Sequence, residues 1–430
     1  MKRRLVAFLV YDLGLLLAGL LLLPWVAWRM VRSPHFRRSL PGRLGYTRRL
    51  PAADGRVLLH GVSVGEVKAL RPLVRLLREQ HPSRELVISA STPTGLETAR
   101  AQFPDLTVVE YPLDLPGACR RFLRRCRPSL VVLAELEIWP NFLRACARAG
   151  IPVAIVNGRI TERSMVGYRR VQKWLPQFER IALYGVQSAR YSERFTRLEV
   201  PRERVVVTGN LKYDNLPTGE EDAAYLASGW PERVAGRPLV VLASTHHDEE
   251  ARVLRAWRAQ GGEALVAVVP RHPRRSAEVL EAARAACPDR PVLLRSALRE
   301  GPLPDRAVLV VDTFGELESL YRAASCAFLG GSLIEHGGQN VLEAAALGLP
   351  VAVGPYTDNF TEEVSLLREA GGIVEGDDAS TVVQSLLGWL EDPSAARRTG
   401  AAAAAALESR RGAAHSTLSA LQDFGLLERA

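Results

Sequence analysis

The sequence predicts an α/β protein made of two consecutive doubly wound domains that follow an apolar N-terminal helix. Its 430 residues exceed one ordinary hydrophobic core and suit two domains. From residue 56 onward, short β-branched runs alternate with longer amphipathic runs, a pattern typical of parallel sheets covered by helices on both faces. A stretch rich in Pro, Gly and acidic residues, Asp214–Pro238, interrupts the alternation, and we place the domain boundary there.

The first element is an apolar run from Leu5 to Trp28, 24 residues with ten leucines and no Lys or Arg, which is long enough to span a bilayer. Asp12 would cost at most about 3 kcal/mol at mid-bilayer, whereas each leucine contributes roughly half a kcal/mol in the opposite direction. A secretory signal is the alternative, but no small-x-small cleavage site follows the run. We therefore expect residues 1–30 to be an uncleaved anchor.

Charge and cysteine content indicate the surroundings of the protein. Lys and Arg exceed Asp and Glu by 56 to 47, so an anionic partner is expected. No zinc-finger spacing or aromatic-rich basic strand favours nucleic acid, and the basic segment after the anchor suits anionic lipid headgroups and places the main body in the cytoplasm. The five cysteines form no C-x-x-C pair, which predicts buried free thiols in a reducing compartment.

The remaining elements form two β/α series. We expect a first domain at residues 31–215, a linker at 216–238, a second domain at 239–393 and a helical tail at 394–430. The tail, Ser394–Leu426, reads as helix and is expected to pack back across the first domain. Ligands of such sheets bind beyond the carboxyl ends of the strands, so we also expect a cleft between the two domains. The predicted strands are Arg56–His60, Leu86–Ala90, Thr107–Tyr111, Leu130–Glu135, Pro152–Val156, Ile181–Val186, Arg204–Thr208, Leu239–Ala243, Leu265–Val269, Val292–Arg295, Ala307–Val311, Cys326–Leu329, Pro350–Val353 and Gly372–Glu375.

Three ionisable residues follow strands of the first series. Glu66 opens the predicted helix Glu66–Glu79, where it serves either as a base or merely as a complement to the helix dipole. Glu135 and Glu137 follow the fourth strand, where a solvated loop is the alternative to a functional site. Lys212 stands at the interdomain hinge, where a lysine is usually a surface residue.

The second series carries features that suit an anion. The hydroxyls of Ser244 and Thr245 precede an acidic first turn as a helix cap would. Pro270-Arg271 forms a rigid turn that presents a guanidinium either to phosphate or to an ion-pair partner. A glycine-rich loop, Gly337–Gly348, opens a helix whose N–H groups suit phosphate, and Glu343 is placed to accept a ribose hydroxyl.

Motifs for other chemistry are missing from the sequence. It contains no G-x-x-x-x-G-K-[ST], no G-x-G-x-x-G after the first strand, no H-E-x-x-H and no Asp-x-Asp. We therefore expect no metal and no redox cofactor.

Eight motifs in this order resemble the bacterial 3-deoxy-D-manno-octulosonic acid (Kdo) transferases, GT-B glycosyltransferases of the family 30 type. The resemblance covers nearly the whole chain. The motifs are the leucine-rich anchor, Ser63–Glu66, Glu135–Asn141, Gly209–Asp214, Ala243–His246, Pro270–Pro273, Asp312–Leu317 and Gly337–Asn340.

The resemblance implies transfer of Kdo from CMP-Kdo to a hydroxyl of a tetraacylated lipid A precursor, with release of CMP, at the cytoplasmic side of the cell inner membrane. It implies that Glu66 is the general base and that Glu135 and Lys212 stabilise the transition state. The residues it implies for CMP binding are Pro270, Arg271, Phe314, Gly315, Glu316, Asn340, Val341, Leu342 and Glu343.

Three residues depart from the usual family pattern. Gln339 replaces a common histidine, Phe314 a common methionine and Val341 a common proline. We expect these three replacements to affect donor affinity more than activity. Two alternatives stay open: another envelope GT-B enzyme that uses a UDP-sugar, and a membrane-anchored nucleotide-binding protein without catalysis.

Overall fold

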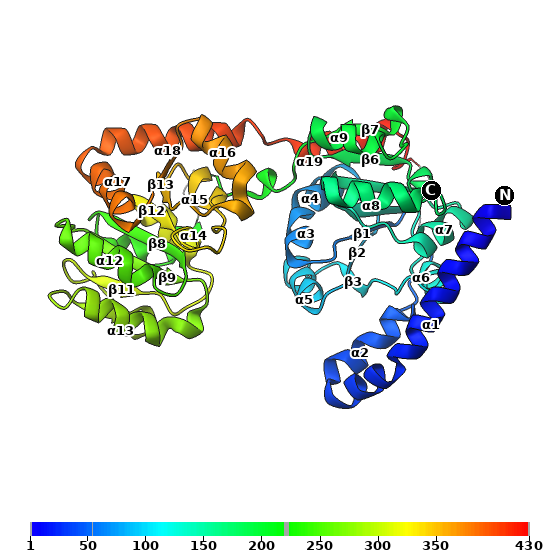
Figure 1. The fold of residues 1–430 in the computed structure, drawn as a ribbon, viewed down its shortest axis with the longest axis horizontal. Helices are drawn as coiled ribbons and strands as arrows, with labels where there is room; N and C mark the ends of the chain where they lie inside the picture. Colours follow the sequence, from blue (N-terminus) through cyan, green and yellow to red (C-terminus); the bar gives the residue numbers. More distant parts are fainter. Residues whose placement is uncertain (1, 54, 219–222, 429–430) are drawn as a thin grey trace. The chain divides into compact units, whose positions relative to one another are not determined.

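The computed structural model describes residues 2–53, 55–218 and 223–428, and the chain divides into two compact units. Unit 1 comprises Met1–Asn215 together with Arg410–Ala430, and unit 2 comprises Leu216–Ser409. Within the described residues, the strands form two parallel sheets of seven strands each, one per unit (Figure 1). The predicted two-domain α/β architecture is confirmed. Each predicted strand matches an observed strand, and their ends differ by no more than two residues.

The sheet of unit 1 has the order β3-β2-β1-β4-β5-β6-β7. Side chains of β1 alternate between its two faces, as parallel strands buried on both sides require. Helices α4, α5 and α19 cover one face, and α6, α7 and α9 cover the other. The elements of unit 1 other than α19 are α1 Lys2–Arg32, α2 Pro34–Arg43, β1 Val57–His60, α3 Val64–Ala69, α4 Arg71–Gln80, β2 Leu86–Ala90, α5 Pro93–Gln102, β3 Thr107–Glu110, α6 Pro116–Cys126, β4 Leu130–Ala134, α7 Pro140–Arg148, β5 Val153–Gly158, α8 Glu162–Gln172, β6 Leu183–Val186, α9 Ala189–Thr196 and β7 Val205–Val207.

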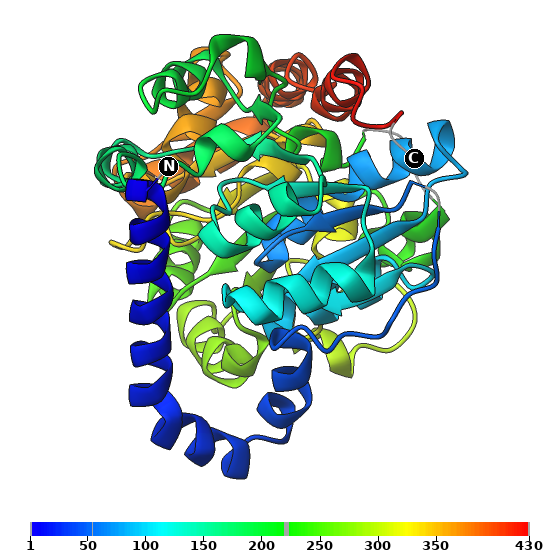
Figure 2. The ribbon, with the colours of Figure 1, turned by 90° about the vertical axis from the view of Figure 1, so that its right-hand side faces the viewer.

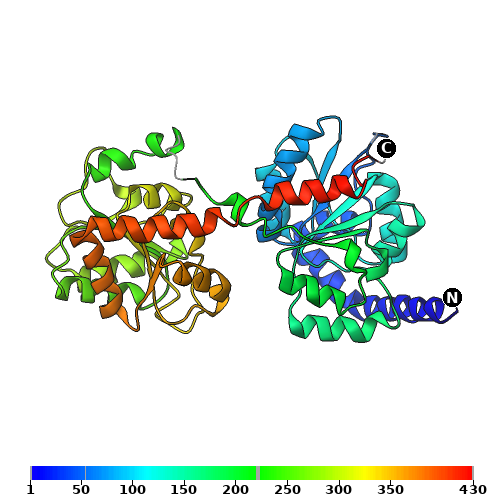
Figure 3. The same cartoon turned by 90° about the horizontal axis from the view of Figure 1, so that it is seen from above.

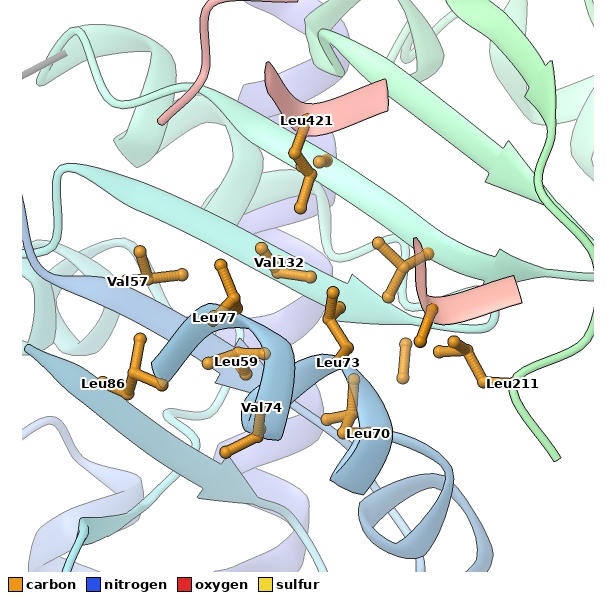
Figure 4. Packing of buried hydrophobic residues seen from close by; sticks show 14 of the residues in the cluster. Val57, Leu59, Leu70, Leu73, Val74, Leu77, Leu86, Val132, Leu211 and Leu421 are labelled. Carbon is orange, nitrogen blue, oxygen red and sulfur yellow. The ribbon is translucent and has the colours of Figure 1, made fainter. Parts of the chain in front are cut away.

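Within the expected tail, the C-terminal helix α19, Ala413–Asp423, packs on unit 1, whereas residues up to Ser409 belong to unit 2 (Figure 3). Leu418 and Leu421 are buried in the same cluster as the leucines of α4, and Figure 4 shows Leu421 above Val132 of β4. The Asp214 carboxylate accepts hydrogen bonds from the backbone N–H groups of Gly412 and Ala414, at 2.7 and 2.6 Å, and so caps the start of the helix. The tail is helical and consists of two helices, because Gly412 adopts φ +98° between α18 and α19.

The sheet of unit 2 has the order β10-β11-β9-β8-β12-β13-β14. Helices α12, α13 and α17 cover one face around Trp257 and Phe328. The expected linker carries two short helices, and Trp230 of the second is fully buried. The elements are α10 Ala223–Ala227, α11 Trp230–Val234, β8 Leu239–Thr245, α12 Glu249–Ala259, β9 Leu265–Pro270, α13 Ser276–Ala286, β10 Val292–Leu294, β11 Val308–Val310, α14 Leu317–Ala323, β12 Cys326–Leu329, α15 Leu342–Ala346, β13 Val351–Val353, α16 Thr361–Glu369, β14 Ile373–Glu375, α17 Ala379–Glu391 and α18 Pro393–Glu408.

The helix predicted over Glu66–Glu79 is two helices, α3 and α4. The Ser63 side chain caps the first one, so it begins at Val64, two residues earlier than expected. Pro72 stands in the first turn of α4, where its missing N–H is tolerated at a helix start but not in a helix interior. The proline therefore marks the break that the sequence analysis overlooked.

Helices α1 and α2 extend from one side of unit 1 (Figure 2). By length and composition, α1 is long and apolar enough over Val6–Arg32 to cross a membrane. Asp12 is not an unpaired charge in this helix, because it accepts hydrogen bonds at 2.8 Å from Asn141 and from Arg144, both on α7. The five cysteines are free and buried, as predicted.

Candidate active site

The order of the unit 1 sheet reverses between β1 and β4, and ligands of doubly wound sheets bind beyond the strand ends at this reversal. The loop after β1 leads into α3, which carries Glu66, and Glu135 follows β4 directly. Arg159 follows the next strand, β5. Three charged side chains therefore extend from the edge of the sheet where a ligand is expected.

Glu66 is held by the turn that precedes its helix. One carboxylate oxygen accepts a hydrogen bond from the Val62 backbone N–H at 2.8 Å, and the other accepts from the Ser63 hydroxyl at 2.9 Å. Burial raises the pKa of Glu66, these two hydrogen bonds lower it, and nearby Glu135 raises it further. The carboxylate is thus oriented and desolvated, and its remaining lone pairs are available to a proton donor.

Glu135 has an unusual backbone conformation for a residue with a side chain. Its φ is +59°, in the left-handed region, while its N–H still donates to the Val156 carbonyl at 2.9 Å. The Arg159 guanidinium donates to the Glu135 carboxylate at 2.8 Å. Sequence reasoning missed Arg159, which lies three residues after the predicted strand Pro152–Val156 but directly after the observed strand β5.

Glu137 completes a group of three carboxylates. Burial raises its pKa to about 7, the hydrogen bond from the Trp139 indole at 2.7 Å lowers it, and Glu66 and Glu135 raise it. The three side chains are therefore close enough to affect one another's charge. A carboxyl group that titrates near neutral pH is common at catalytic sites.

Lys212 lies in the segment 211–215, which hydrogen bonds hold to the end of β5 and to α3. The Asn157 side chain at the end of β5 accepts from the Leu211 N–H at 3.0 Å, and Asn215 donates to the Lys68 carbonyl on α3 at 2.8 Å. No hydrogen bond or ion pair between described residues joins the Lys212 ammonium to Glu66 or Glu135. The segment 211–215 therefore lies next to this site, but Lys212 forms no described contact with the Glu66 or Glu135 carboxylate.

In unit 2, the reversal of strand order lies between β8 and β12, and the loops after these strands are joined there. Gln339 lies 3.0 Å from His246, measured between their Nε2 atoms. The Gly338 N–H donates to the Gly331 carbonyl at 2.8 Å, and the Arg271 N–H donates to the Thr245 carbonyl at 2.9 Å. Three segments therefore meet at the carboxyl edge of this sheet: the predicted glycine-rich loop, the turn after β8 and the turn that carries Arg271.

Three histidines lie close together at the turn that follows β8. The His246 and His336 ring centroids are 4.0 Å apart, and the His272 ring lies edge-on to His246 at 6.4 Å. Burial lowers the pKa of His246 to about 4, with smaller contributions from neighbouring His336 and from arginines. His246 is therefore neutral near pH 7 and can accept a hydrogen bond from the Gln339 amide.

Glu249 fixes the loop after β12, a role that sequence reasoning did not assign. Its buried carboxylate accepts from the backbone N–H groups of Gly331, Ser332 and Leu333 at 2.7 to 3.1 Å, and from His246 N–H at 2.8 Å. The hydroxyl cap expected at this helix is wrong, because α12 has no side-chain cap. The Thr245 hydroxyl instead donates to Glu250.

The residues predicted for donor binding differ in what they offer to a ligand. Phe314 is 86% exposed, whereas Val341 and Leu342 are buried and can reach a ligand only through their backbone. The Glu316 carboxylate is occupied by hydrogen bonds from Trp230, Arg295 and Thr313. Pro270 ends β9, exposed Arg271 follows it, and Gly315 adopts φ +83°.

The helix expected after the glycine-rich loop is short, since α15 covers five residues. Asn340 spans its start, accepting from the Leu342 N–H at 3.1 Å and donating to Glu343 at 3.2 Å. No described contact joins the 314–316 segment to His246 or Gln339. The helix that follows this segment, α14, carries Tyr321, which lies near enough to Glu343 for the Glu343 charge to raise the Tyr321 pKa.

The two seven-stranded parallel sheets define the two-domain fold of the GT-B type. The same fold occurs in the UDP-GlcNAc 2-epimerase from Neisseria meningitidis, with a TM-score of 0.59 and 15% identity over 86% of this chain and 100% of that one. It also occurs in MurG from Acinetobacter baumannii, with a TM-score of 0.51 and 14% identity over 86% and 99%.

Sequence comparison narrows this class to one family. Residues 38–215 match the family described as 3-deoxy-D-manno-octulosonic-acid transferase, and residues 308–406 match glycosyl transferases group 1. The chain is 33% identical to the 3-deoxy-D-manno-octulosonic acid transferase of Haemophilus influenzae over 97% of this chain and 98% of that protein. Its identity to the Bordetella pertussis transferase is 36%, over 96% and 99%. The chain belongs to the Kdo transferase family and is a glycosyltransferase.

Proposed function

We propose that this protein transfers Kdo from CMP-Kdo to a hydroxyl of lipid IVA, the tetraacyl lipid A precursor, and releases CMP. The bond between the anomeric carbon of Kdo and the CMP phosphate oxygen breaks, and its electron pair leaves with CMP. A new bond forms between the acceptor oxygen and that carbon. The acceptor proton passes to a base of the protein.

The observation that carries this proposal is the placement of Glu66. Its carboxylate stands beyond the strand ends at the reversal of the sheet, is oriented by Ser63 and the Val62 N–H, and has a raised pKa. A raised pKa makes a carboxylate a better proton acceptor near neutral pH. We assign Glu66 as the general base, with Glu135 and Lys212 as the groups that stabilise the transition state.

The donor assignment rests on the joined loops of unit 2. The Arg271 guanidinium suits the phosphate of CMP, and backbone groups around the 338–342 loop suit the same anion. The segments that we assign to CMP are Pro270–Arg271, Phe314–Glu316 and Asn340–Glu343. In the 314–316 segment, exposed Phe314 and the backbone are the available contacts, because the Glu316 carboxylate is already occupied.

The acceptor is a membrane lipid, and α1 supplies a means of staying beside it. Five arginines follow the apolar part of α1, at positions 29, 32, 37, 38 and 43, and by the positive-inside rule they support a cytoplasmic location of the two units, at the inner membrane. Acceptor and enzyme would then share one surface.

The test is mass spectrometry of lipid IVA incubated with the purified full-length protein and CMP-Kdo. We expect a mass increase corresponding to added Kdo and an equivalent release of CMP. Parallel reactions with UDP-sugars provide the control. Product from a UDP-sugar and none from CMP-Kdo would identify a different envelope glycosyltransferase and reject the proposal.

A further inference from the structure

A groove between α6 and α7 of unit 1 contains four arginines. The cavity has a volume of about 370 Å³. Arg120 and Arg124 line it from α6, and Arg144 and Arg148 line it from α7. The spacing of four residues on each helix places both members of a pair on the same face. Four arginines thus line one cavity.

Their charges are largely uncompensated by the protein. Arg144 pairs with Asp12 of α1 at 2.8 Å. Arg120, Arg124 and Arg148 form no ion pair with a carboxylate in the part of the chain that the structure describes. Like charges at this spacing on a helix repel each other. Such an arrangement is stabilised when an anion enters the groove.

The groove has the further properties of a phosphate site. Pro116 and Gly117, in the first turn of α6, also line it, and α6 has no side-chain cap, so the Gly117 backbone N–H is available there. Arginine binds phosphate through two parallel hydrogen bonds. Leu123 and Ile151 add an apolar part to the lining. The groove therefore suits a phosphate that is attached to a hydrocarbon chain.

The groove lies beside α1, the helix that can enter a membrane (Figure 1). The Arg144 guanidinium lies over the Phe8 ring at 4.3 Å, and the Tyr11 hydroxyl donates to Asp114, two residues before α6, at 2.9 Å. The leucines of α1 beyond these contacts, from Leu13 to Leu23, are largely exposed. The part of α1 that packs on unit 1 therefore lies next to the groove. The exposed apolar part, from Leu13 to Leu23, follows it along the helix.

We propose that the α6–α7 groove binds the phosphate headgroup of an anionic membrane phospholipid, as a site separate from the one that contains Glu66. Bound headgroups would fix unit 1 to the membrane surface beside the N-terminal part of α1, where Phe8 and Asp12 contact Arg144. This goes beyond a general attraction of basic residues to lipid, because it assigns recognition to three particular arginines. Each basic residue near an anionic surface contributes roughly fivefold in affinity, so the three together account for about 100-fold.

The experiment uses full-length protein in neutral detergent, with native mass spectrometry to count bound lipids and thermal melting to measure stabilisation. The probes are phosphatidylglycerol and, as a neutral comparison, phosphatidylcholine. We expect the wild type to retain phosphatidylglycerol and to melt at a higher temperature in its presence. In the triple variant Arg120→Gln, Arg124→Gln, Arg148→Gln, phosphatidylglycerol affinity should fall about 100-fold. Arg144 is left in place because it holds Asp12.

A matched control removes the same charge elsewhere through Arg202→Gln, Arg255→Gln and Arg299→Gln, three exposed arginines far from α6 and α7 in sequence. This control should bind phosphatidylglycerol like the wild type. The single variant Arg148→Gln, with about fivefold weaker binding expected, keeps the test valid if the triple variant misfolds. Equal phosphatidylglycerol binding by the wild type and the triple variant would overturn the proposal. Equal stabilisation by inorganic phosphate would overturn the assignment to a lipid headgroup.

Discussion

At the scale of single residues, neighbouring groups shift the pKa of Glu66 in opposite directions. Burial and the Glu135 charge favour its protonated form, whereas the Ser63 and Val62 donors favour the carboxylate. Such a group can take up a proton during a reaction and release it afterwards.

The variant Glu66→Gln should keep the fold and the CMP affinity, while transfer falls at least ~100-fold, because an amide cannot accept the acceptor proton. Transfer rate, melting temperature and calorimetric CMP affinity are to be measured on the same preparation. A helix-dipole role predicts instead a stability loss of roughly 0.3–1 kcal/mol with turnover nearly intact. Near-wild-type transfer would remove Glu66 as the base.

Arg271 allows a separate test of the donor site. Arg271→Ala should weaken CMP binding by roughly 1.5–3 kcal/mol, the usual contribution of a charged hydrogen bond. Calorimetric titration with CMP measures the change, and Arg274→Ala, a nearby exposed arginine outside the proposed contacts, is the matched control. If Arg271→Ala binds CMP like the wild type, Arg271 does not contact the donor.

Glu137 predicts a pH dependence of stability. Its pKa rises from 4.5 to about 7 on folding, so between these values the folded state binds more protons than the unfolded state. The contribution of Glu137 to stability is therefore greatest below pH 4.5 and declines as the pH rises to about 7. Glu137→Gln removes this decline and keeps an acceptor for Trp139. Its melting temperature relative to wild type should be higher at pH 8 than at pH 5, and a difference that does not change with pH would contradict the assignment.

Sequence reasoning could place Glu66 and Glu135 near one another because both follow strands of a parallel sheet. It could not find the clamp made by Glu249, because that side chain bonds to backbone groups about 80 residues away, and no local pattern encodes such a contact. Nor could it show that Glu316 is occupied by Trp230, which lies in a segment expected to be a linker.

At the scale of elements, the strands were predictable because each is a short and mostly apolar run, and the central strands, such as β1 and β4, are buried on both faces. The helix boundaries were less so. The break between α3 and α4 depends on Pro72, and the break before α19 depends on Gly412 in the left-handed region. Both are local backbone effects that a window-based apolar pattern averages away.

The attachment of α19 provides a prediction for an element. Asp214→Ala removes the acceptor of two backbone N–H groups at the start of the helix and should destabilise unit 1 by about 1–2 kcal/mol, as for other lost helix caps. Urea denaturation followed by circular dichroism measures the loss. Asp423→Ala, at the other end of α19, is the matched control and should have little effect. Equal stability of both variants would show that Asp214 does not hold the helix.

At the scale of the whole molecule, the chain leaves unit 1 after Asn215 and returns to it at Arg410. The order of β/α units predicted the two sheets. The alanine-rich tail predicted a helix, but its pattern did not show where the chain re-enters unit 1. The contacts of α1 with α7 were not predictable, since an apolar run reads only as an anchor and not as a surface that also packs on protein.

Deleting residues 1–30 should leave a folded, soluble and active protein with weaker membrane attachment, because the sheet begins only at Val57. The deletion also removes Phe8 and Asp12, so the melting temperature should fall by a few degrees as Arg144 and Asn141 lose their partners. Membrane fractionation, circular dichroism and the transfer assay measure these effects. A deletion variant that cannot fold would show that α1 is part of the structural core.

The left-handed backbone at Glu135 has an evolutionary consequence. An L-residue in this region costs roughly 1–2 kcal/mol, a cost that glycine does not incur and asparagine incurs less. Folding alone therefore favours glycine at position 135, whereas the proposed chemistry requires a carboxylate there. A descendant that had lost the need for transfer would be free to drift to the less strained residue. The amino acid at this one position would then distinguish lineages that keep the reaction from those that keep only the fold.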